Sequence, residues 1–321
     1  MMFMKRTVFL ALLGSSLLFG CRTVNEQPPE PAESSTTALQ SSDDFVVVPS
    51  RTNDVQFRIY TNASPYASHL FNTFEIEAYG EVLLKSPRGD KWQKWSSSTG
   101  SSPHNILVNG AGPELDSSNS MSLADSTAGP DWRYVALDAN AAYRAQLKEY
   151  KRHILFVEPD LFVLYDHLVA KKPSDFRMLL HAPDETRLDP VWRDLRLDLP
   201  KAGFRIHSPA RRKQPRNWEC LESTTQKSFS DNTVTLQLGP TNKVAQLDLL
   251  TVFAIKHGGE KKELAFRLLE SPNAIGARIH RDGLPTLVAF KTDTSGGQPT
   301  LTGFPFSGPV GVDIFKPKPK H

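Results

Sequence analysis

Two tryptophans and two lysines stand close together in one stretch of this sequence, Lys91, Trp92, Lys94 and Trp95. An exposed indole offers a flat apolar face to a sugar ring, and an ammonium group attracts carboxylates and sulfates. Tryptophan side chains more often cap a hydrophobic core. The stretch is therefore either a ligand-binding loop or a cap on the core, and we name its four residues as candidate substrate-binding residues.

The densest positive charge comes further along the chain, at Arg211, Arg212, Lys213, Arg216 and the neighbouring Trp218. Prolines before and within this stretch predict a loop. A basic loop attracts polyanions by charge alone. We name these five residues as candidate substrate-binding residues as well.

A third candidate surface depends on how residues 141–156 fold. Helix propensity there competes with the alternation of Tyr143, Ala145 and Leu147, which favours an extended chain or two strands. In an extended chain Arg144 would share one face with other polar side chains. That face would be either an anion-binding surface or an ordinary solvated one, and we name Arg144 as a candidate.

Familiar catalytic motifs are missing from the sequence. It holds no G-x-S-x-G element, no phosphate-binding loop and no C-x-x-C pair, so hydrolase, nucleotide and redox chemistry lack support. Asp166 lies within an apolar run, with His153 and His167 near it in the sequence. A buried carboxylate of this kind is more often satisfied by backbone donors at a strand corner than catalytic, so we expect a structural role.

The elements that must position these residues are strands. From Asp44 onward the hydrophobic pattern has a period of two, as in Phe74, Ile76 and Ala78, and turn signals such as residues 158–160 separate the runs. Many strands joined by close turns predict an all-β fold, a large antiparallel β-sandwich of two sheets. The predicted strands are 55–60, 74–78, 106–108, 134–137, 161–168, 176–180, 204–207, 234–238, 247–255, 264–269, 277–280 and 286–290.

Composition adds limits to this fold. The chain has 321 residues and a formal net charge of +3, which indicates no particular partner. Its two cysteines are Cys21 and Cys220. If Cys21 is lipidated, no intrachain disulfide is available and burial must supply the stability.

The amino terminus reads as a targeting segment. Lys5 and Arg6 precede an apolar run at 7–19, which is too short to span a bilayer, and the run leads to Cys21. This arrangement resembles the bacterial lipoprotein processing box, although an ordinary secretory signal with a chance cysteine is the alternative. We predict a lipoprotein signal peptide at 1–20, a disordered tether at 21–43 and a β-sandwich domain at 44–321. Acyl chains on Cys21 would anchor the protein in the cell envelope, at the outer membrane or cell surface.

Three stretches, taken in order, resemble the C-terminal β-domain of heparinase II/III-type polysaccharide lyases. Residues 68–81 resemble a family strand that opens with H-x-H-x-D, and residues 103–110 resemble its H-N-T segment. Residues 143–168 resemble two further strands joined by a turn. The resemblance implies a β-sandwich that acts on acidic glycans, and it adds Asn105 to the candidate substrate-binding residues.

The resemblance also implies a metal site. It places His69 and His104 on two of the family's zinc ligands, and Asp90 is the nearest carboxylate to the third position. Zinc takes about four ligands in tetrahedral array. These residues are therefore either part of a zinc site, with zinc as the candidate cofactor, or polar residues that hydrogen-bond to the backbone.

Departures from the family pattern bear on activity. The resemblance places Ala67 on the first histidine of H-x-H-x-D and Phe71 on its aspartate, and an alanine cannot transfer a proton. It also implies a helical toroid that supplies half of the lyase cleft, and no toroid is predicted in this sequence. We expect a protein that binds or presents acidic polysaccharide. The alternatives are a lyase, acting alone or with a separately encoded helical subunit, and a structural or partner-binding lipoprotein; nucleic acid is not an expected partner.

Overall fold

The computed structural model describes residues 40–42, 44–62, 71–85, 104–114, 120–189, 194–208, 218–223, 233–261, 264–281, 284–292 and 298–315. The chain divides into two units, Met1–Ser35 and Thr36–His321, and all the described residues belong to the second. Among these residues no helix is long and apolar enough to cross a membrane.

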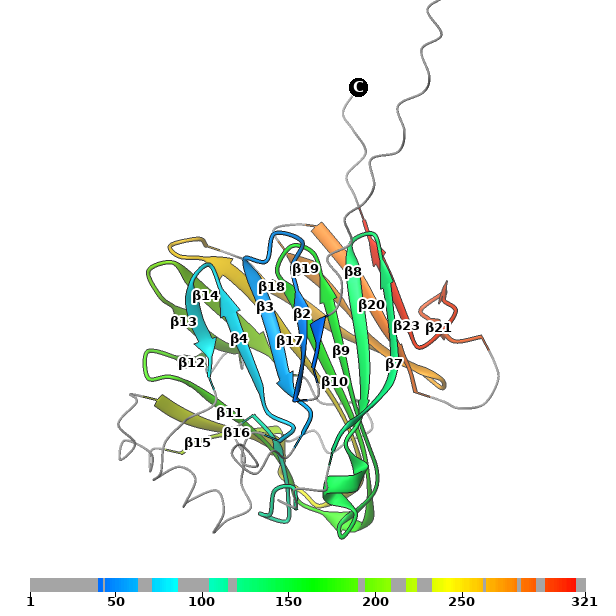
Figure 1. Ribbon diagram of the computed structural model, residues 1–321. Coiled ribbons are helices and arrows are strands. Elements are labelled where there is room, and N and C mark those ends of the chain that lie inside the picture. Colours follow the sequence, from blue (N-terminus) through cyan, green and yellow to red (C-terminus); the bar gives the residue numbers. More distant parts are fainter. Residues whose placement is uncertain are drawn as a thin grey trace, which may run out of the picture. The chain divides into compact units, whose positions relative to one another are not determined.

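An eight-stranded antiparallel sheet forms the centre of this unit (Figure 1). Its strands follow the order β12-β13-β14-β17-β10-β9-β8-β7. Their bounds are β7 (Ser122–Gly129), β8 (Trp132–Asp138), β9 (Leu147–Val157), β10 (Leu161–Ser174), β12 (Arg187–Asp189), β13 (Asp194–Asp198), β14 (Ala202–His207) and β17 (Val244–His257).

Two smaller sheets bury one face of the central sheet in the first hydrophobic core. One has five strands, β1 (Gln40–Ser41), β2 (Phe45–Pro49), β3 (Val55–Tyr60), β4 (Phe74–Ala78) and β5 (Glu81–Leu84). The other has the order β15-β16-β11-β6, with β6 (Ile106–Val108), β11 (Phe176–Pro183), β15 (Trp218–Ser223) and β16 (Thr233–Pro240). In β3 buried side chains alternate with half-buried ones, which explains why a sequence that alternates apolar and polar residues forms such a strand.

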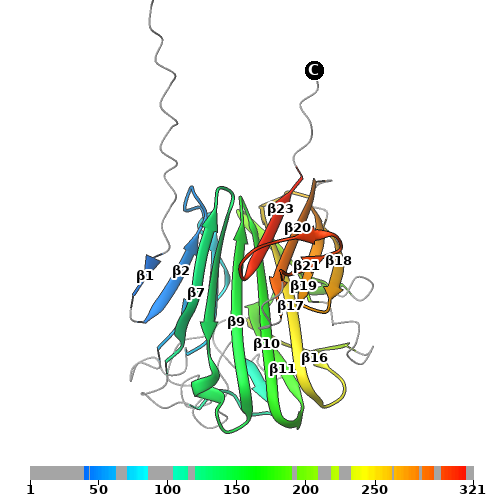
Figure 2. The same cartoon turned by 90° about the vertical axis from the view of Figure 1, so that its right-hand side faces the viewer.

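A fourth sheet covers the opposite face. It consists of β18 (Leu264–Ser271), β19 (Ala274–Arg281), β20 (Leu284–Lys291) and β23 (Val310–Ile314). A second hydrophobic core lies between it and the central sheet. The short strands β21 (Thr300–Leu301) and β22 (Phe304–Pro305) contribute to a third cluster on its outer side. Figure 2 shows the resulting layers in turn, first blue, then green, then orange and red.

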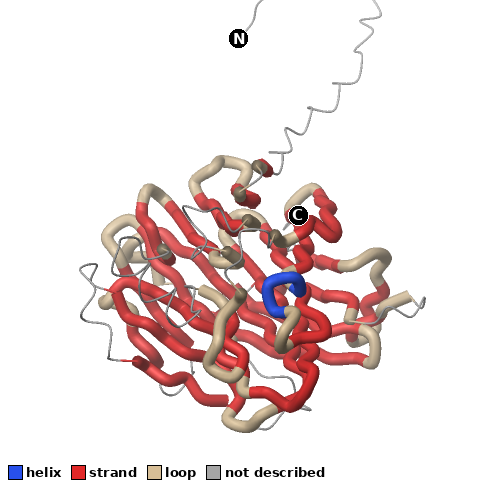
Figure 3. The backbone as a smooth tube through the Cα atoms, turned by 60° about the horizontal axis from the view of Figure 1, so that its bottom comes forward, coloured by secondary structure: helices blue, strands red, loops and turns tan. Residues whose placement is uncertain are grey.

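The predicted all-β fold, a large antiparallel β-sandwich, is confirmed, and each of the twelve predicted strands matches or lies within a strand of the structure. The prediction of two sheets is wrong, because the central sheet is covered on both faces. Residues 141–146 are also not extended. Asn140–Tyr143 forms a 3₁₀ turn, the one helical turn within the described part (Figure 3), and β9 begins only at Leu147.

Candidate functional site

A buried ion pair lies on the inner face of the central sheet. Arg152 of β9 and Asp166 of β10 are directly opposite one another in the strand register, and both side chains are 0% exposed. The guanidinium Nε donates to Asp166 Oδ1 at 2.7 Å, and Nη2 donates to Oδ2 at 3.2 Å. This forked geometry satisfies both carboxylate oxygens. Asp166 is thus structural, as expected, but its partner is an arginine side chain rather than backbone donors.

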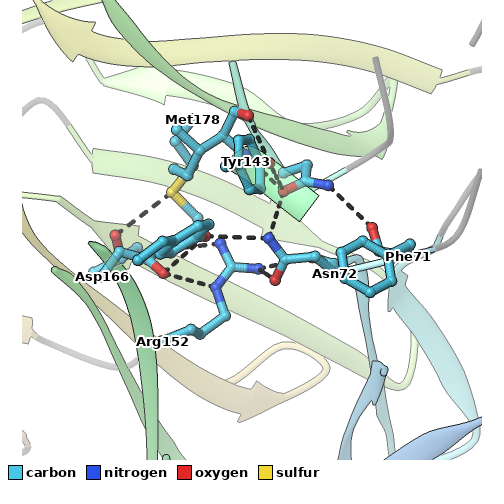
Figure 4. Close-up of polar contacts among 10 residues, drawn as sticks. Phe71, Asn72, Tyr143, Arg152, Asp166 and Met178 are labelled. Atoms are coloured by element: carbon cyan, nitrogen blue, oxygen red, sulfur yellow. Dashed lines mark hydrogen bonds and ion pairs between the residues drawn. The ribbon is translucent and has the colours of Figure 1, made fainter. Parts of the chain in front are cut away.

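The pair belongs to a wider network that reaches two other chain segments (Figure 4). Arg152 Nη1 donates to the backbone oxygen of Asn72 at 2.8 Å and to its Oδ1 at 3.0 Å. Asn72 Nδ2 donates in turn to Asn105 Oδ1 at 2.7 Å, and Asn105 Nδ2 donates to the Phe71 backbone oxygen at 3.0 Å. The Tyr143 hydroxyl lies 2.5 Å from Asn105 Oδ1 and 2.8 Å from the Ile106 oxygen. Side chains thus cross-link the strand pair to the segments at 71–73 and 104–106.

Burial sets the protonation of this network. It disfavours the charged guanidinium, but Asp166 more than offsets that effect together with the neighbouring tyrosines, so the pKa of Arg152 is raised. Burial also raises the pKa of Tyr143 and that of Tyr150, whose hydroxyl donates to Asp166 Oδ1 at 3.1 Å. The two tyrosines therefore stay neutral and act as hydrogen-bond donors.

Two strained backbone positions lie at this network. Asn72 and His104 have φ of 58° and 53°, in the left-handed region that non-glycine residues seldom adopt. Such conformations persist where surrounding contacts hold them. Asn72 comes two residues after the stretch 63–70, which carries His69. His104 directly follows the stretch 86–103, which carries Asp90, Lys91, Trp92, Lys94 and Trp95. The network therefore fixes the chain where both stretches of predicted site residues end.

His104 packs against a second histidine that the sequence analysis missed. The His104 and His181 rings are 5.7 Å apart between centroids, and His104 Nδ1 accepts from the backbone N–H of His181 at 3.3 Å. Burial lowers the pKa of His104 to about 3 and also lowers the pKa of His181. Both rings are therefore neutral. The two histidines are far apart in the sequence, and the pairing of β11 with β6 brings them together.

Neutral imidazoles suit a zinc ion, yet the described residues do not complete a site for one. No group of three or more His, Cys, Asp or Glu side chains that could hold a metal occurs among them. His69 and Asp90, the other predicted ligands, lie outside the described residues. We therefore derive no chemistry from a metal.

Most of the predicted binding residues also lie outside the described residues, namely Lys91, Trp92, Lys94, Trp95, Arg211, Arg212, Lys213 and Arg216, as does Cys21. Three others are placed. Asn105 is fully buried in the network, which leaves it no surface for a sugar. Arg144 is exposed beyond the 3₁₀ turn and pairs with Glu114 at 3.5 Å, so it belongs to no strand face. Trp218 begins β15 opposite Pro240 rather than lying in a loop.

A second polar cluster occupies the other face of the central sheet. Asp248 of β17 accepts from the Tyr165 hydroxyl at 2.8 Å, and His167 Nδ1 lies 2.7 Å from the same oxygen. His153, between Tyr134 and Tyr165, bonds the Tyr134 hydroxyl at 2.7 Å. Burial lowers the pKa of His153 to about 3, so it is neutral.

Comparison with solved structures identifies the architecture. A crystal structure of a heparan sulfate lyase from Pedobacter heparinus matches 80% of this chain, with a TM-score of 0.61 and 11% sequence identity. The chain has the fold of the heparinase III β-domain. A heparinase III structure matches 79% of the chain with a TM-score of 0.61 and 11% identity, and a second heparinase III matches 79% with a TM-score of 0.59 and 10% identity.

The match extends over only part of each solved structure. It covers 43%, 42% and 42% of those three solved chains, so this chain spans less than half of their length, the part that holds the C-terminal domain. No protein-family model and no curated protein matches the sequence. The likeness thus rests on the fold.

Proposed function

We propose that this protein binds acidic polysaccharide at the bacterial cell envelope and does not depolymerise it alone. The observation that carries the proposal is the fold match, which covers 80% of this chain and 43% of a heparan sulfate lyase. Anchoring through Cys21 is part of the proposal and rests on the apolar run that precedes it.

The chemistry of the described core supports binding over turnover. Lyase chemistry needs a base, an acid and a group that neutralises the substrate carboxylate, all held against one sugar. Tyr143, Tyr150 and Asp166 carry suitable groups, but each is 1% exposed or less and engaged in the network. Ala67 stands where the family resemblance places a histidine, and its methyl group cannot transfer a proton.

One assay pair tests the proposal. Purified protein is applied to immobilised heparin at low salt, and the same preparation is incubated with heparin, heparan sulfate, chondroitin and alginate while the absorbance of the unsaturated sugar end is followed. Retention on heparin without product formation is the expected result. Steady product formation by the pure chain would contradict the proposal, and so would a lack of binding to every glycan.

The second candidate is a lyase, favoured by the fact that the three matched structures are a heparan sulfate lyase and heparinases. In that case the chain would act with a helical domain or subunit that completes the cleft. Product formation that appears only when a separately purified helical subunit is added would establish this alternative.

A further inference from the structure

Three arginines stand side by side across three neighbouring strands. The antiparallel register places Arg187 of β12 directly opposite Arg196 of β13, and Arg196 directly opposite Arg205 of β14. Neighbouring strands are about 5 Å apart, so three guanidinium groups start from backbone positions within about 10 Å. We call these residues the arginine row.

The row lies on a part of the central sheet beyond the second hydrophobic core. Arg205 pairs with Ala254, which places the row on the face that holds the second core. That core draws its central-sheet residues from β8, β9, β10 and β17, and it includes none of the side chains that the structure describes in β12, β13 and β14. His207 of β14 marks the border of the fourth sheet, because its ring packs at a tilt against Phe266 of β18, with 4.9 Å between the ring centroids. Beyond it the face carries charge instead of apolar side chains.

The opposite face of the same strands explains why they stay in the sheet. Leu195 and Leu197 of β13 and Phe204 and Ile206 of β14 are buried in the first core. This burial stabilises the strands whatever the other face carries. The arginines are therefore not needed to hold β13 and β14 in place.

Cross-strand neighbours of like charge destabilise a sheet, and the row is only partly compensated. Arg196 is engaged within the protein, with Asp194 Oδ1 3.3 Å from its Nε and a further interaction beside it. Arg187 Nη1 donates to the backbone oxygens of Asp184 and Thr186 and, within the described part of the chain, to no carboxylate. For Arg205 the described contacts include no hydrogen bond and no ion pair.

Asp198, the next carboxylate on this face, is already engaged. Lys256 of β17 reaches across Gly203 to form an ion pair with Asp198. A Cβ at Gly203 would lie 2.9 Å from Lys256 Cε, so the glycine makes room for that reach. The neighbouring acid is thus occupied by a lysine rather than an arginine of the row.

We propose that the arginine row binds an acidic polysaccharide chain that crosses β12, β13 and β14. Guanidinium forks recognise carboxylate and sulfate groups through paired hydrogen bonds. A polyanion with closely spaced charges would relieve the repulsion between neighbouring arginines. Arg196 and Arg205 are half-buried, so their aliphatic side-chain carbons would stay packed while their guanidinium groups face the ligand. This inference rests on the proposed function and names its binding surface.

The test compares two cross-strand arginine pairs. Arg196→Gln with Arg205→Gln removes two charges from the row. Arg267→Gln with Arg278→Gln removes two charges from a pair with the same cross-strand geometry on β18 and β19. Heparin binding is measured by titration calorimetry at several salt concentrations, and binding to phosphatidylglycerol vesicles is measured in parallel. Thermal unfolding of each variant reports folding.

The row variant should bind heparin about tenfold more weakly than the wild type, with a shallower salt dependence, while the control variant stays within about twofold. The melting temperature of the row variant should equal or exceed that of the wild type, because the row variant lacks the repulsion between Arg196 and Arg205.

Other outcomes would overturn the inference in distinguishable ways. Equal losses in both variants would show that overall charge, not the row, governs binding. Loss of vesicle binding with unchanged heparin binding would assign the row to anionic lipid. A wild type that binds no glycan would overturn the proposed function, and the inference with it. A large fall in the melting temperature of the row variant would show that the arginines are structural.

Discussion

Removal of one charge from the buried ion pair should destabilise the protein severely. In Asp166→Asn, Arg152 would keep its bonds to Asn72 but would lose the carboxylate that balances its charge at 0% exposure. Breaking a buried pair from one side costs about 3–5 kcal/mol. A typical domain has a free energy of unfolding of about 5–15 kcal/mol, so this change would remove a large share of it.

The double variant Arg152→Met with Asp166→Leu should cost less than Asp166→Asn. It leaves no unpaired charge, and apolar replacement of a buried pair is often neutral. Its remaining cost comes from Asn72, whose backbone and side-chain oxygens lose the Arg152 donor, and from Tyr150, whose hydroxyl loses the Asp166 acceptor. An unsatisfied buried acceptor costs about 1–3 kcal/mol.

Urea denaturation followed by tryptophan fluorescence measures these differences as shifts in the midpoint at a constant slope. Asp131→Asn is the matched control, because it breaks the Arg51–Asp131 ion pair, whose side chains are 45% and 28% exposed. Exposed pairs contribute about 1 kcal/mol or less. If Asp166→Asn costs no more than this control, the reasoning about the buried pair is refuted.

Three further predictions concern other parts of the chain. The pKa of His153 is about 3 in the folded state and about 6.5 in the unfolded state, so the stability it contributes should be lost as the pH falls from 6.5 toward 3, at up to about 1.4 kcal/mol per pH unit. Between pH 7, 5.5 and 4.5 the urea midpoint of His153→Gln should fall less than that of the wild type. An equal fall in both proteins would contradict this prediction. Gly203→Ala should lower the melting temperature, because its Cβ would lie 2.3 Å from the Leu197 backbone oxygen, and overpacking costs about 1–3 kcal/mol; an unchanged melting temperature would show that the strands can move apart. Cys21→Ser should release the protein from membranes in fractionation, and unchanged fractionation would place the anchor elsewhere.

Strands could be predicted from the sequence wherever one face is buried. β3 and β4 alternate apolar and polar residues, and their predicted bounds agree with the structure. β7 was missed because its first seven side chains are exposed, so nothing in its sequence had to alternate. The second covering layer was missed because a strand buried on both faces, such as β17, has a continuous apolar run that does not show how many sheets pack against it.

Contacts within a hairpin could in principle be predicted, whereas contacts between distant segments could not. The turn at 158–160 was recognised, and pairing Val157 with Leu161 and counting outward brings Arg152 opposite Asp166. The links from Arg152 to Asn72 and from Asn72 to Asn105 join residues 80 and 33 positions apart. They depend on how sheets pack, which the local pattern does not contain.

The buried Arg152–Asp166 pair and the arginine row differ in how they affect the stability of the ligand-free protein. Arg152 is paired, buried and hydrogen-bonded, so no ligand is needed to balance it. Arg205 stands directly opposite Arg196, and like charges in such cross-strand positions repel one another until an anion lies between them. A ligand that binds only the folded state stabilises it in proportion to the logarithm of its concentration over Kd. Heparin should therefore raise the melting temperature of the wild type, most strongly at low salt, and should do so much less when Arg196 and Arg205 are glutamines. A heparin effect of equal size in both proteins would place the binding surface on another part of the chain.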